Sequence, residues 1–284
     1  MTAGLAQADG VELYFERRGN GPPLLLIPGG GGDCGFYTAL GEVLSRSYTV
    51  IAYDRRGNSR SRLRGAPRKI TVAQQAEDAL AVLRANGFAS AAVFGSSGGA
   101  TIALEMAARH PHAADAVVPH EPATPKVLPD GGAVLAEFDE VERVLADEGW
   151  EEAFKLFAKV NRLVKPGDGK ALDAVLRPDG AVPRGPLRDL LERQSRNWEY
   201  MLRYEVRPFV EYPPDLERIR SNAVPLALLS GAKTRGQYFH RASEVIAERL
   251  GVGHVEFPGG HSGALESPVP FGLKLEALLG RLRA

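Results

Sequence analysis

Residues 93–99 read Val-Phe-Gly-Ser-Ser-Gly-Gly and contain the pattern Gly-x-Ser-x-Gly, formed by Gly95, Ser97 and Gly99. An apolar run precedes the pattern, and residues 100–109, which follow it, favour a helix. A serine at such a strand-to-helix turn is raised clear of the sheet, in a turn known as a nucleophile elbow. Glycine is needed on both sides because the turn is strained and side chains there would clash. Ser97 is therefore the candidate nucleophile.

Strand-like and helix-like segments alternate on both sides of this turn. Short, wholly apolar runs such as residues 24–27 are typical of buried parallel strands. The expected strands cover residues 11–16, 24–27, 48–53, 91–94, 116–121, 225–230 and 254–257, and the expected helices cover 71–85, 100–110, 239–250 and 269–282. This alternation predicts an α/β fold with a mostly parallel central sheet flanked by helices.

Between residues 122 and 214 the pattern changes to helices alone. Apolar side chains recur there at helical spacing, for example at Phe138, Val141 and Leu145, and most of them are expected to form helix core. We expect a core domain of residues 1–121 and 215–284, with residues 122–214 inserted as a helical cap or lid. Such a cap would cover the C-terminal edge of the sheet, where ligands bind in folds of this kind.

The composition sets limits on partners and location. The 284-residue chain has 35 basic and 35 acidic residues, so we expect no nucleic-acid partner and no anionic membrane surface. Its one cysteine, Cys34, excludes an internal disulfide and fits a reducing compartment. Residues 1–10 lack the features of a secretory signal, and no apolar run reaches membrane-spanning length. We expect a cytoplasmic protein, and the composition leaves a homo-oligomer open.

A serine hydroxyl needs a base and a group that orients that base. Of six histidines, His261 lies in a glycine-rich loop after the last expected strand, which fits the chain order nucleophile, acid, histidine. An aspartate is expected near Thr234, but none is present. Glu121 ends the strand after the elbow and would lie at the same edge of the sheet. Glu121 is the predicted acid, and a purely structural glutamate is the alternative.

Two backbone amides are required to bind the oxyanion that forms when a carbonyl is attacked. One would come from Gly98, the residue after the nucleophile. The other would come from the glycine run after residues 24–27, where Gly30 is favoured and Gly31 comes next. A chain without side chains can bring its amides close to a substrate carbonyl.

Taken together, these motifs resemble the α/β-hydrolase superfamily over almost the whole chain. Within it, the chain resembles the zearalenone-lactonase type, which shares a glycine-containing loop, a Ser-Ser-Gly elbow, a His-Glu strand end and the missing aspartate. That resemblance implies a Ser-His-Glu triad and a lid tryptophan that lines the substrate pocket. The matching residues here are Ser97 as nucleophile, His261 as base, Glu121 as acid, the amides of Gly30 and Gly98, and Trp198 in the lid.

These observations predict a serine hydrolase that cleaves an ester or lactone of a small hydrophobic molecule through an acyl-enzyme. Thioester and carbon–carbon bond hydrolysis remain open, and neither a cofactor nor a metal is expected. One alternative is a non-catalytic binding protein of the same fold. Another is a dinucleotide-dependent oxidoreductase, because Gly30, Gly32 and Gly35 form Gly-x-Gly-x-x-Gly and Asp54 ends the next strand. We interpret Asp54 instead as a structural turn residue.

Overall fold

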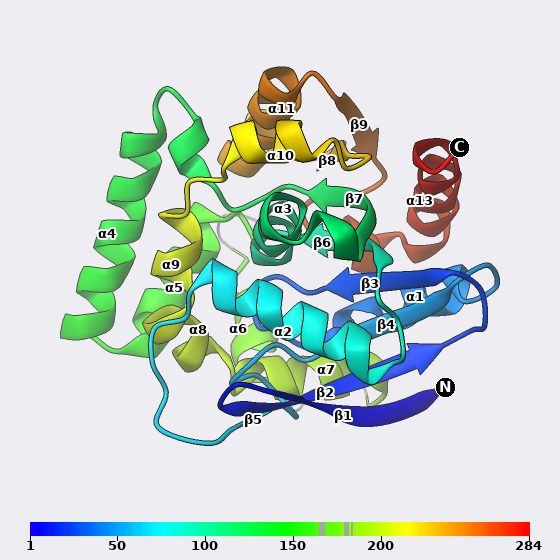
Figure 1. The fold of residues 1–284 in the computed structure, drawn as a ribbon. Helices are drawn as coiled ribbons and strands as arrows, with labels where there is room; N and C mark the ends of the chain where they lie inside the picture. Colours follow the sequence, from blue (N-terminus) through cyan, green and yellow to red (C-terminus); the bar gives the residue numbers. More distant parts are fainter. Residues whose placement is uncertain (165–167, 179–181, 183) are drawn as a thin grey trace.

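A computed structural model describes residues 1–164, 168–178, 182 and 184–284. A nine-stranded sheet forms its centre (Figure 1). The strands are β1 (Thr2–Ala8), β2 (Val11–Arg18), β3 (Pro23–Ile27), β4 (Thr49–Tyr53), β5 (Arg62–Leu63), β6 (Ala91–Ser96), β7 (Ala114–His120), β8 (Ala227–Gly231) and β9 (Gly253–Phe257).

The strand order is β1-β2-β4-β3-β6-β7-β8-β9, with β5 paired to β2. Strands β1, β2 and β4 pair antiparallel, and every pair from β4 to β9 is parallel. Crossover helices place the C-terminal ends of the parallel strands along one edge. The expected α/β fold with a mostly parallel sheet is confirmed.

Helices cover both faces of the sheet, and each face packs into an apolar core of its own. Alternate residues of β6 point into one core or the other. Ala91 and Val93 pack in one apolar cluster, with helices α2 (Val72–Ala85), α3 (Gly98–Arg109), α10 (Leu216–Asn222) and α11 (Tyr238–Leu250). Ala92 and Phe94 pack in the other, with α1 (Thr38–Leu44), α12 (Gly263–Glu266) and α13 (Pro268–Leu282). The period of two in strand side chains explains this division.

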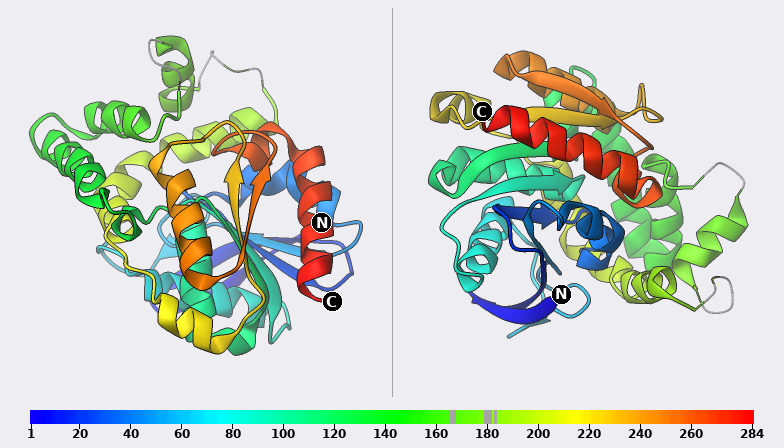
Figure 2. Two further views of the ribbon diagram at one scale, coloured as in Figure 1. Left: turned by 90° about the horizontal axis from the view of Figure 1, so that it is seen from above. Right: turned by 90° about the vertical axis from the view of Figure 1, so that its right-hand side faces the viewer.

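Among the described residues, six helices lie between β7 and α10, and we call them the helical insertion. They are α4 (Gly131–Asp147), α5 (Trp150–Val160), α6 (Gly169–Leu176), α7 (Pro186–Ser195), α8 (Trp198–Tyr204) and α9 (Val206–Val210). Four of these helices, α4, α5, α6 and α8, share an apolar cluster that includes Val141, Phe154 and Trp198. Figures 1 and 2 show the insertion gathered beyond the C-terminal ends of β3, β6 and β7.

Some elements were not predicted. Strand β1 has the sequence Thr-Ala-Gly-Leu-Ala-Gln-Ala, whose small residues have little intrinsic preference for a strand. Pairing with β2 along the whole of β1, from Thr2 opposite Arg17 to Ala8 opposite Val11, holds it in place. The helix α1, the two-residue strand β5 and three 3₁₀ turns, η1 (Cys34–Tyr37), η2 (Pro111–Ala113) and η3 (Pro125–Val127), were also not predicted. In the described part of the chain, no helix combines the length and apolar character needed to cross a bilayer.

Close backbone packing at the end of β6 generates a stability prediction. A Cβ on Gly99 would lie 2.1 Å from Ile27 O, so Gly99→Ala forces the first turn of α3 away from β3. We expect Gly99→Ala to lower the free energy of unfolding by about 1–3 kcal/mol, as overpacking does. Urea denaturation measures the change. Gly132→Ala in α4 is the control, because nothing lies within 4 Å of its new Cβ, and equal stability losses in the two variants would contradict the packing argument.

Candidate active site

Ser97 occupies the turn between β6 and α3 with a strained backbone. Its φ of 56° and ψ of −123° lie outside the regions that side-chain-bearing residues normally adopt. Its amide donates to His120 O at 2.9 Å, which holds the turn against β7. A Cβ on Gly95 would lie 2.1 Å from Gly99 O, so both flanking positions require glycine. The Ser97 side chain is partly exposed at the C-terminal edge of the sheet.

His261 lies in the loop after β9 and contacts Glu121 directly. Its Nδ1 is 2.6 Å from Glu121 Oε2, and its side chain is 16% exposed whereas that of Glu121 is fully buried. A carboxylate on Nδ1 fixes the imidazole so that Nε2 is free to act toward a substrate or a nucleophile. The structure therefore joins two residues that are 140 positions apart in the chain.

The loop after β8, which lacks the expected aspartate near Thr234, donates hydrogen bonds to Glu121 instead. Glu121 follows β7 with a φ of 52°, a left-handed conformation that breaks the strand. Its Oε1 accepts from the amide of Gly231 at 2.8 Å and from the hydroxyl of Thr234. Burial alone raises the pKa of Glu121, but the hydrogen bond from His261 and the other nearby donors and charges outweigh it and lower the pKa to about 2. Glu121 is therefore ionised at neutral pH.

Aromatic rings hold His261 in place. The ring centroid of Phe239, on α11, is 4.0 Å from that of His261. The ring of the buried His120 stacks on that of His261, with the centroids 6.4 Å apart. The Nδ1 of His120 is 3.1 Å from Ser96 Oγ. Its Nε2 has no hydrogen-bond partner among the described residues, and burial lowers the pKa of His120 to about 4. His120 is a neutral structural residue at physiological pH.

Two unbonded amides lie beside the elbow. Within the part of the chain that the structure describes, the amides of Gly30 and Gly98 donate no hydrogen bond. A Cβ on Gly29, one residue before Gly30, would lie 2.8 Å from Ser97 Cβ, so the glycine loop runs directly past the nucleophile. This arrangement suits an oxyanion hole. Gly31, with a φ of 75°, belongs to the same loop.

Side chains of the helical insertion cover these glycines. Met201 Sδ would lie 3.1 Å from a Cβ on Gly30, and Phe209 would lie at the same distance from a Cβ on Gly98. Both side chains are buried. The surroundings of the unbonded amides are therefore apolar on the side of the insertion.

Trp198 is more deeply packed than a pocket wall requires. It is 6% exposed and donates from Nε1 to Val175 O at 3.2 Å. Its ring lies tilted against that of Phe154, with the ring centroids 4.6 Å apart. The edge of its ring also contacts Gly31, since a Cβ there would lie 2.8 Å from it. Trp198 thus belongs to the core of the insertion and contacts the glycine loop, while a substrate-binding role stays a prediction.

In the described part of the chain, no hydrogen bond joins Ser97 to His261, whose Nδ1 contacts Glu121. Catalytic contacts often tighten only when substrate is bound. Phe239, Met201 and Phe209 were not predicted as neighbours of the site. Their spacing is that of ordinary helix core, and only the tertiary packing brings them to the site.

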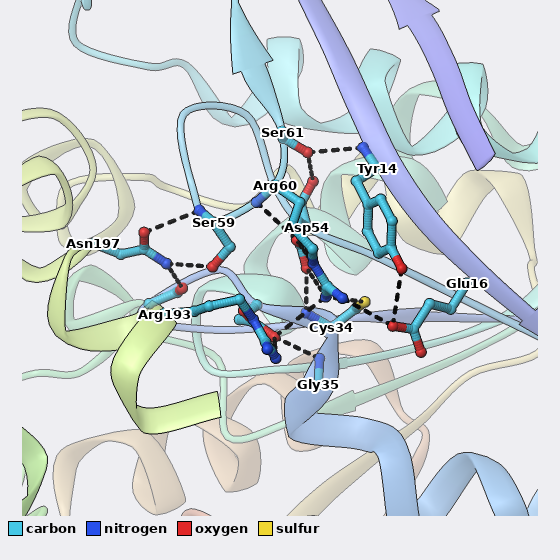
Figure 3. Close-up of polar contacts among 12 residues, drawn as sticks. Tyr14, Glu16, Cys34, Gly35, Asp54, Ser59, Arg60, Ser61, Arg193 and Asn197 are labelled. Atoms are coloured by element: carbon cyan, nitrogen blue, oxygen red, sulfur yellow. Dashed lines mark hydrogen bonds and ion pairs between the residues drawn. The ribbon is translucent and has the colours of Figure 1, made fainter. Parts of the chain in front are cut away.

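Asp54 is buried, and other residues of the protein donate hydrogen bonds to its carboxylate. Its carboxylate accepts from the amide of Cys34 at 2.8 Å and from Arg60 Nε at 2.7 Å, as Figure 3 shows. It is 0% exposed, so it is not placed to bind a ribose hydroxyl. No group of three or more His, Cys, Asp or Glu side chains in the described residues could hold a metal ion.

Comparison with known proteins places the chain in a family. Residues 22–165 match the family model described as alpha/beta hydrolase fold. An uncharacterized hydrolase of Bacillus subtilis (strain 168), YraK, is 31% identical over 264 residues, which cover 92% of this chain and 89% of that protein. The chain therefore belongs to the α/β-hydrolase fold family, and the prediction of a hydrolase of this fold is confirmed.

More distant similarities point in the same direction. The zearalenone hydrolase of Bionectria ochroleuca is 25% identical over 147 residues, covering 50% of this chain and 55% of that protein. The structure of an esterase from Thermogutta terrifontis matches with a TM-score of 0.75 at 20% identity over 100% of both chains. An enol-lactonase from Burkholderia xenovorans LB400 matches with a TM-score of 0.64 at 21% identity, covering 98% of this chain and 100% of that one.

The buried His120 predicts an acid-sensitive stability. The pKa of His120 falls from 6.5 to about 4 on folding, so below pH 6.5 the unfolded chain binds a proton that the folded chain does not. We expect the free energy of unfolding to decrease by up to about 3 kcal/mol as the pH falls from 6.5 to 4. Glu121, whose pKa is lowered from 4.5 to about 2, extends the loss as the pH falls from 4.5 to 2.

Urea denaturation of wild type and His120→Asn at several pH values measures this effect. For each protein, the free energy of unfolding is plotted against pH. The difference between the two slopes gives the contribution of His120, because the other histidines are common to both proteins. A variant whose pH dependence equals that of wild type between pH 6.5 and 4 would show that His120 does not cause the loss.

Proposed function

We propose that this protein is a serine hydrolase that cleaves an ester or lactone of a small hydrophobic molecule. The observation that carries the proposal is the 2.6 Å contact between His261 Nδ1 and the buried Glu121 carboxylate, at the sheet edge where Ser97 projects. We assign Ser97 as nucleophile, His261 as general base and Glu121 as the acid that orients it. The amides of Gly30 and Gly98 would bind the oxyanion, with the amide of Gly31 as the next candidate from the glycine loop.

The reaction then proceeds in two halves. Ser97 Oγ attacks the substrate carbonyl while its proton passes to His261 Nε2, and the carbonyl oxygen becomes an anion bound by the two amides. The intermediate collapses, the carbon–oxygen bond to the alcohol breaks, and His261 returns the proton to the leaving oxygen. In a lactone that oxygen stays attached to the acyl chain. Water, deprotonated by His261, then releases the acid and restores Ser97.

The substrate class is inferred from the surroundings of the site. Met201, Phe209 and Phe239 are buried apolar side chains beside the oxyanion glycines and the base. An uncharged, apolar acyl group suits such walls better than a charged one, because no compensating partner would meet the charge. The zearalenone-lactonase type and the Ser-His-Glu triad fit this inference, since one relative is a zearalenone hydrolase.

Two further assignments belong with this proposal. We treat residues 122–214 as the cap domain and residues 1–121 with 215–284 as the core domain, with Trp198 as a cap residue near the substrate. We also infer a cytoplasmic protein from its one cysteine, which is free and buried. The dinucleotide alternative loses support, because the carboxylate of Asp54 is already bonded to Arg60.

Labelling with a fluorophosphonate tests the nucleophile. Such a reagent reacts with a serine only when its base and oxyanion hole are assembled. We expect intact-protein mass spectrometry to show one adduct on wild type and none on Ser97→Ala. Ser96→Ala is the matched control: it removes the neighbouring hydroxyl, which contacts His120, and should still be labelled.

The two negative results would have different meanings. Labelling of Ser97→Ala would assign the nucleophile to another residue. An unlabelled wild type would contradict the serine hydrolase and favour the non-catalytic binding protein of this fold.

Substitution of Glu121 tests the acid. Without its carboxylate the imidazole loses both its orientation and the stabilisation of its charged form, so we expect Glu121→Ala to lower kcat roughly 10³- to 10⁴-fold. The hydrolysis of p-nitrophenyl butyrate provides the assay. Asp215→Ala is the control, because Asp215 caps α10 by accepting from the amide of Arg218 at 3.0 Å. An active Glu121→Ala together with an inactive Asp215→Ala would overturn the assignment.

A further inference from the structure

Arg55 lies fully buried under the loop that carries the proposed oxyanion amides. Its side chain is 0% exposed. Its Nε donates to Pro28 O at 3.0 Å, and its Nη2 donates to Gly29 O at 2.9 Å. We infer that Arg55 is a positioning residue for the oxyanion hole, because it fixes the orientation of the Gly29–Gly30 peptide. This inference rests on the serine-hydrolase function proposed above.

Peptide planarity connects the carbonyl that Arg55 holds to the amide that would bind the oxyanion. The C=O of Gly29 and the N–H of Gly30 belong to one planar trans peptide and point in opposite directions. When Arg55 holds the carbonyl, the amide of Gly30 is directed the other way. The amide of Gly32 also donates to Gly29 O, at 3.1 Å, so Arg55 and this turn hold the carbonyl together. Glycine on both sides of the bond adds no Cβ that would restrict the rotation of this peptide.

Glu205 holds Arg55 in turn. Its two carboxylate oxygens accept from Nη1 and Nη2 of Arg55, each at 2.8 Å, and its side chain is 1% exposed. Asn58 Nδ2 also donates to Glu205 Oε1 at 2.9 Å. The planar guanidinium fork matches a carboxylate in this bidentate geometry and leaves Nε and a further N–H for the loop. Because Glu205 lies between α8 and α9, the helical insertion contributes to the position of Arg55.

A second residue of the insertion contacts the same loop. Asn197 Nδ2 donates to Gly31 O at 2.7 Å. The same amide donates to Ser59 Oγ at 2.8 Å (Figure 3). The carbonyls of Pro28, Gly29 and Gly31 therefore all accept hydrogen bonds from side chains outside the loop. This leaves the loop few ways to turn its amides away from Ser97.

The Gly30 amide that Arg55 positions affects the reaction rate only while the oxyanion exists. The Gly30 amide meets a full negative charge only in the transition state and the tetrahedral intermediate. A misdirected amide therefore lowers kcat while KM changes little. A loss of general stability, by contrast, lowers the amount of active protein, but it leaves the kcat and the KM of the folded fraction unchanged.

Arg55→Lys tests the inference. Lysine keeps the charge that Glu205 requires, but its single ammonium group cannot hold the Pro28 and Gly29 carbonyls with the geometry of the fork. We expect kcat for p-nitrophenyl butyrate to fall at least about tenfold with KM within about twofold, since removal of a whole oxyanion donor costs roughly 10²–10³ in kcat. The rate constant for fluorophosphonate labelling of Ser97 should fall in parallel.

Arg56→Lys is the matched control. Arg56 is also buried in a bidentate ion pair, with Asp78 at 2.6 Å from both Nε and Nη2. Among the described residues, its other side-chain hydrogen bond goes to Asp9 O and not to the glycine loop. We expect Arg56→Lys to show a comparable loss of thermal stability but a kcat and a labelling rate close to wild type.

Glu205→Gln is a second variant of nearly the same shape, and it decides the matter if Arg55→Lys does not fold. It loosens the guanidinium without removing it, so we expect a smaller loss of kcat, again with little change in KM. Equal kinetic losses in the Arg55 and Arg56 variants, or unchanged kcat in both Arg55→Lys and Glu205→Gln, would overturn the role of Arg55. An inert wild type would instead overturn the serine-hydrolase function itself.

Discussion

The close approach of the first turn of α3 to the ends of β3 and β6 is the constraint on which this structure depends. Gly99 packs on Ile27 O and Gly95 packs on Gly99 O, with no space for a Cβ at either position. This contact drives Ser97 into its strained conformation, and such strain costs about 1–3 kcal/mol at a single residue. The two apolar cores on either side of the sheet offset that cost.

The remaining groups of the proposed site, Glu121 and His261, lie at the same C-terminal edge of the sheet. Glu121 leaves β7 in a left-handed conformation and meets His261 from the loop after β9. Three donors surround the carboxylate, from Gly231, Thr234 and His261. A buried carboxylate is stable as an anion only with such partners, which explains how a strand end can supply the acid when the loop after β8 has none.

The helical insertion does more than cover the edge of the sheet. Its Glu205 and Asn197 reach the glycine loop through buried polar contacts, and its Met201 and Trp198 pack on the glycines themselves. A loop of consecutive glycines has high conformational entropy, so it requires contacts from outside to adopt one conformation. Core and insertion are thus linked at the point where the proposed chemistry takes place.

The α/β class, the elbow at Ser97 and the candidates His261 and Glu121 could be predicted from the sequence, because strand and helix periods and glycine spacing are local properties. Strand β1 was not predicted, because its small residues form a strand only through pairing with β2. Three contacts became known only from the folded chain: Glu121 lies 2.6 Å from His261, Arg55 is buried under the glycine loop, and Trp198 packs inside the insertion. These are contacts between residues far apart in the chain, and no local pattern encodes the distance between them.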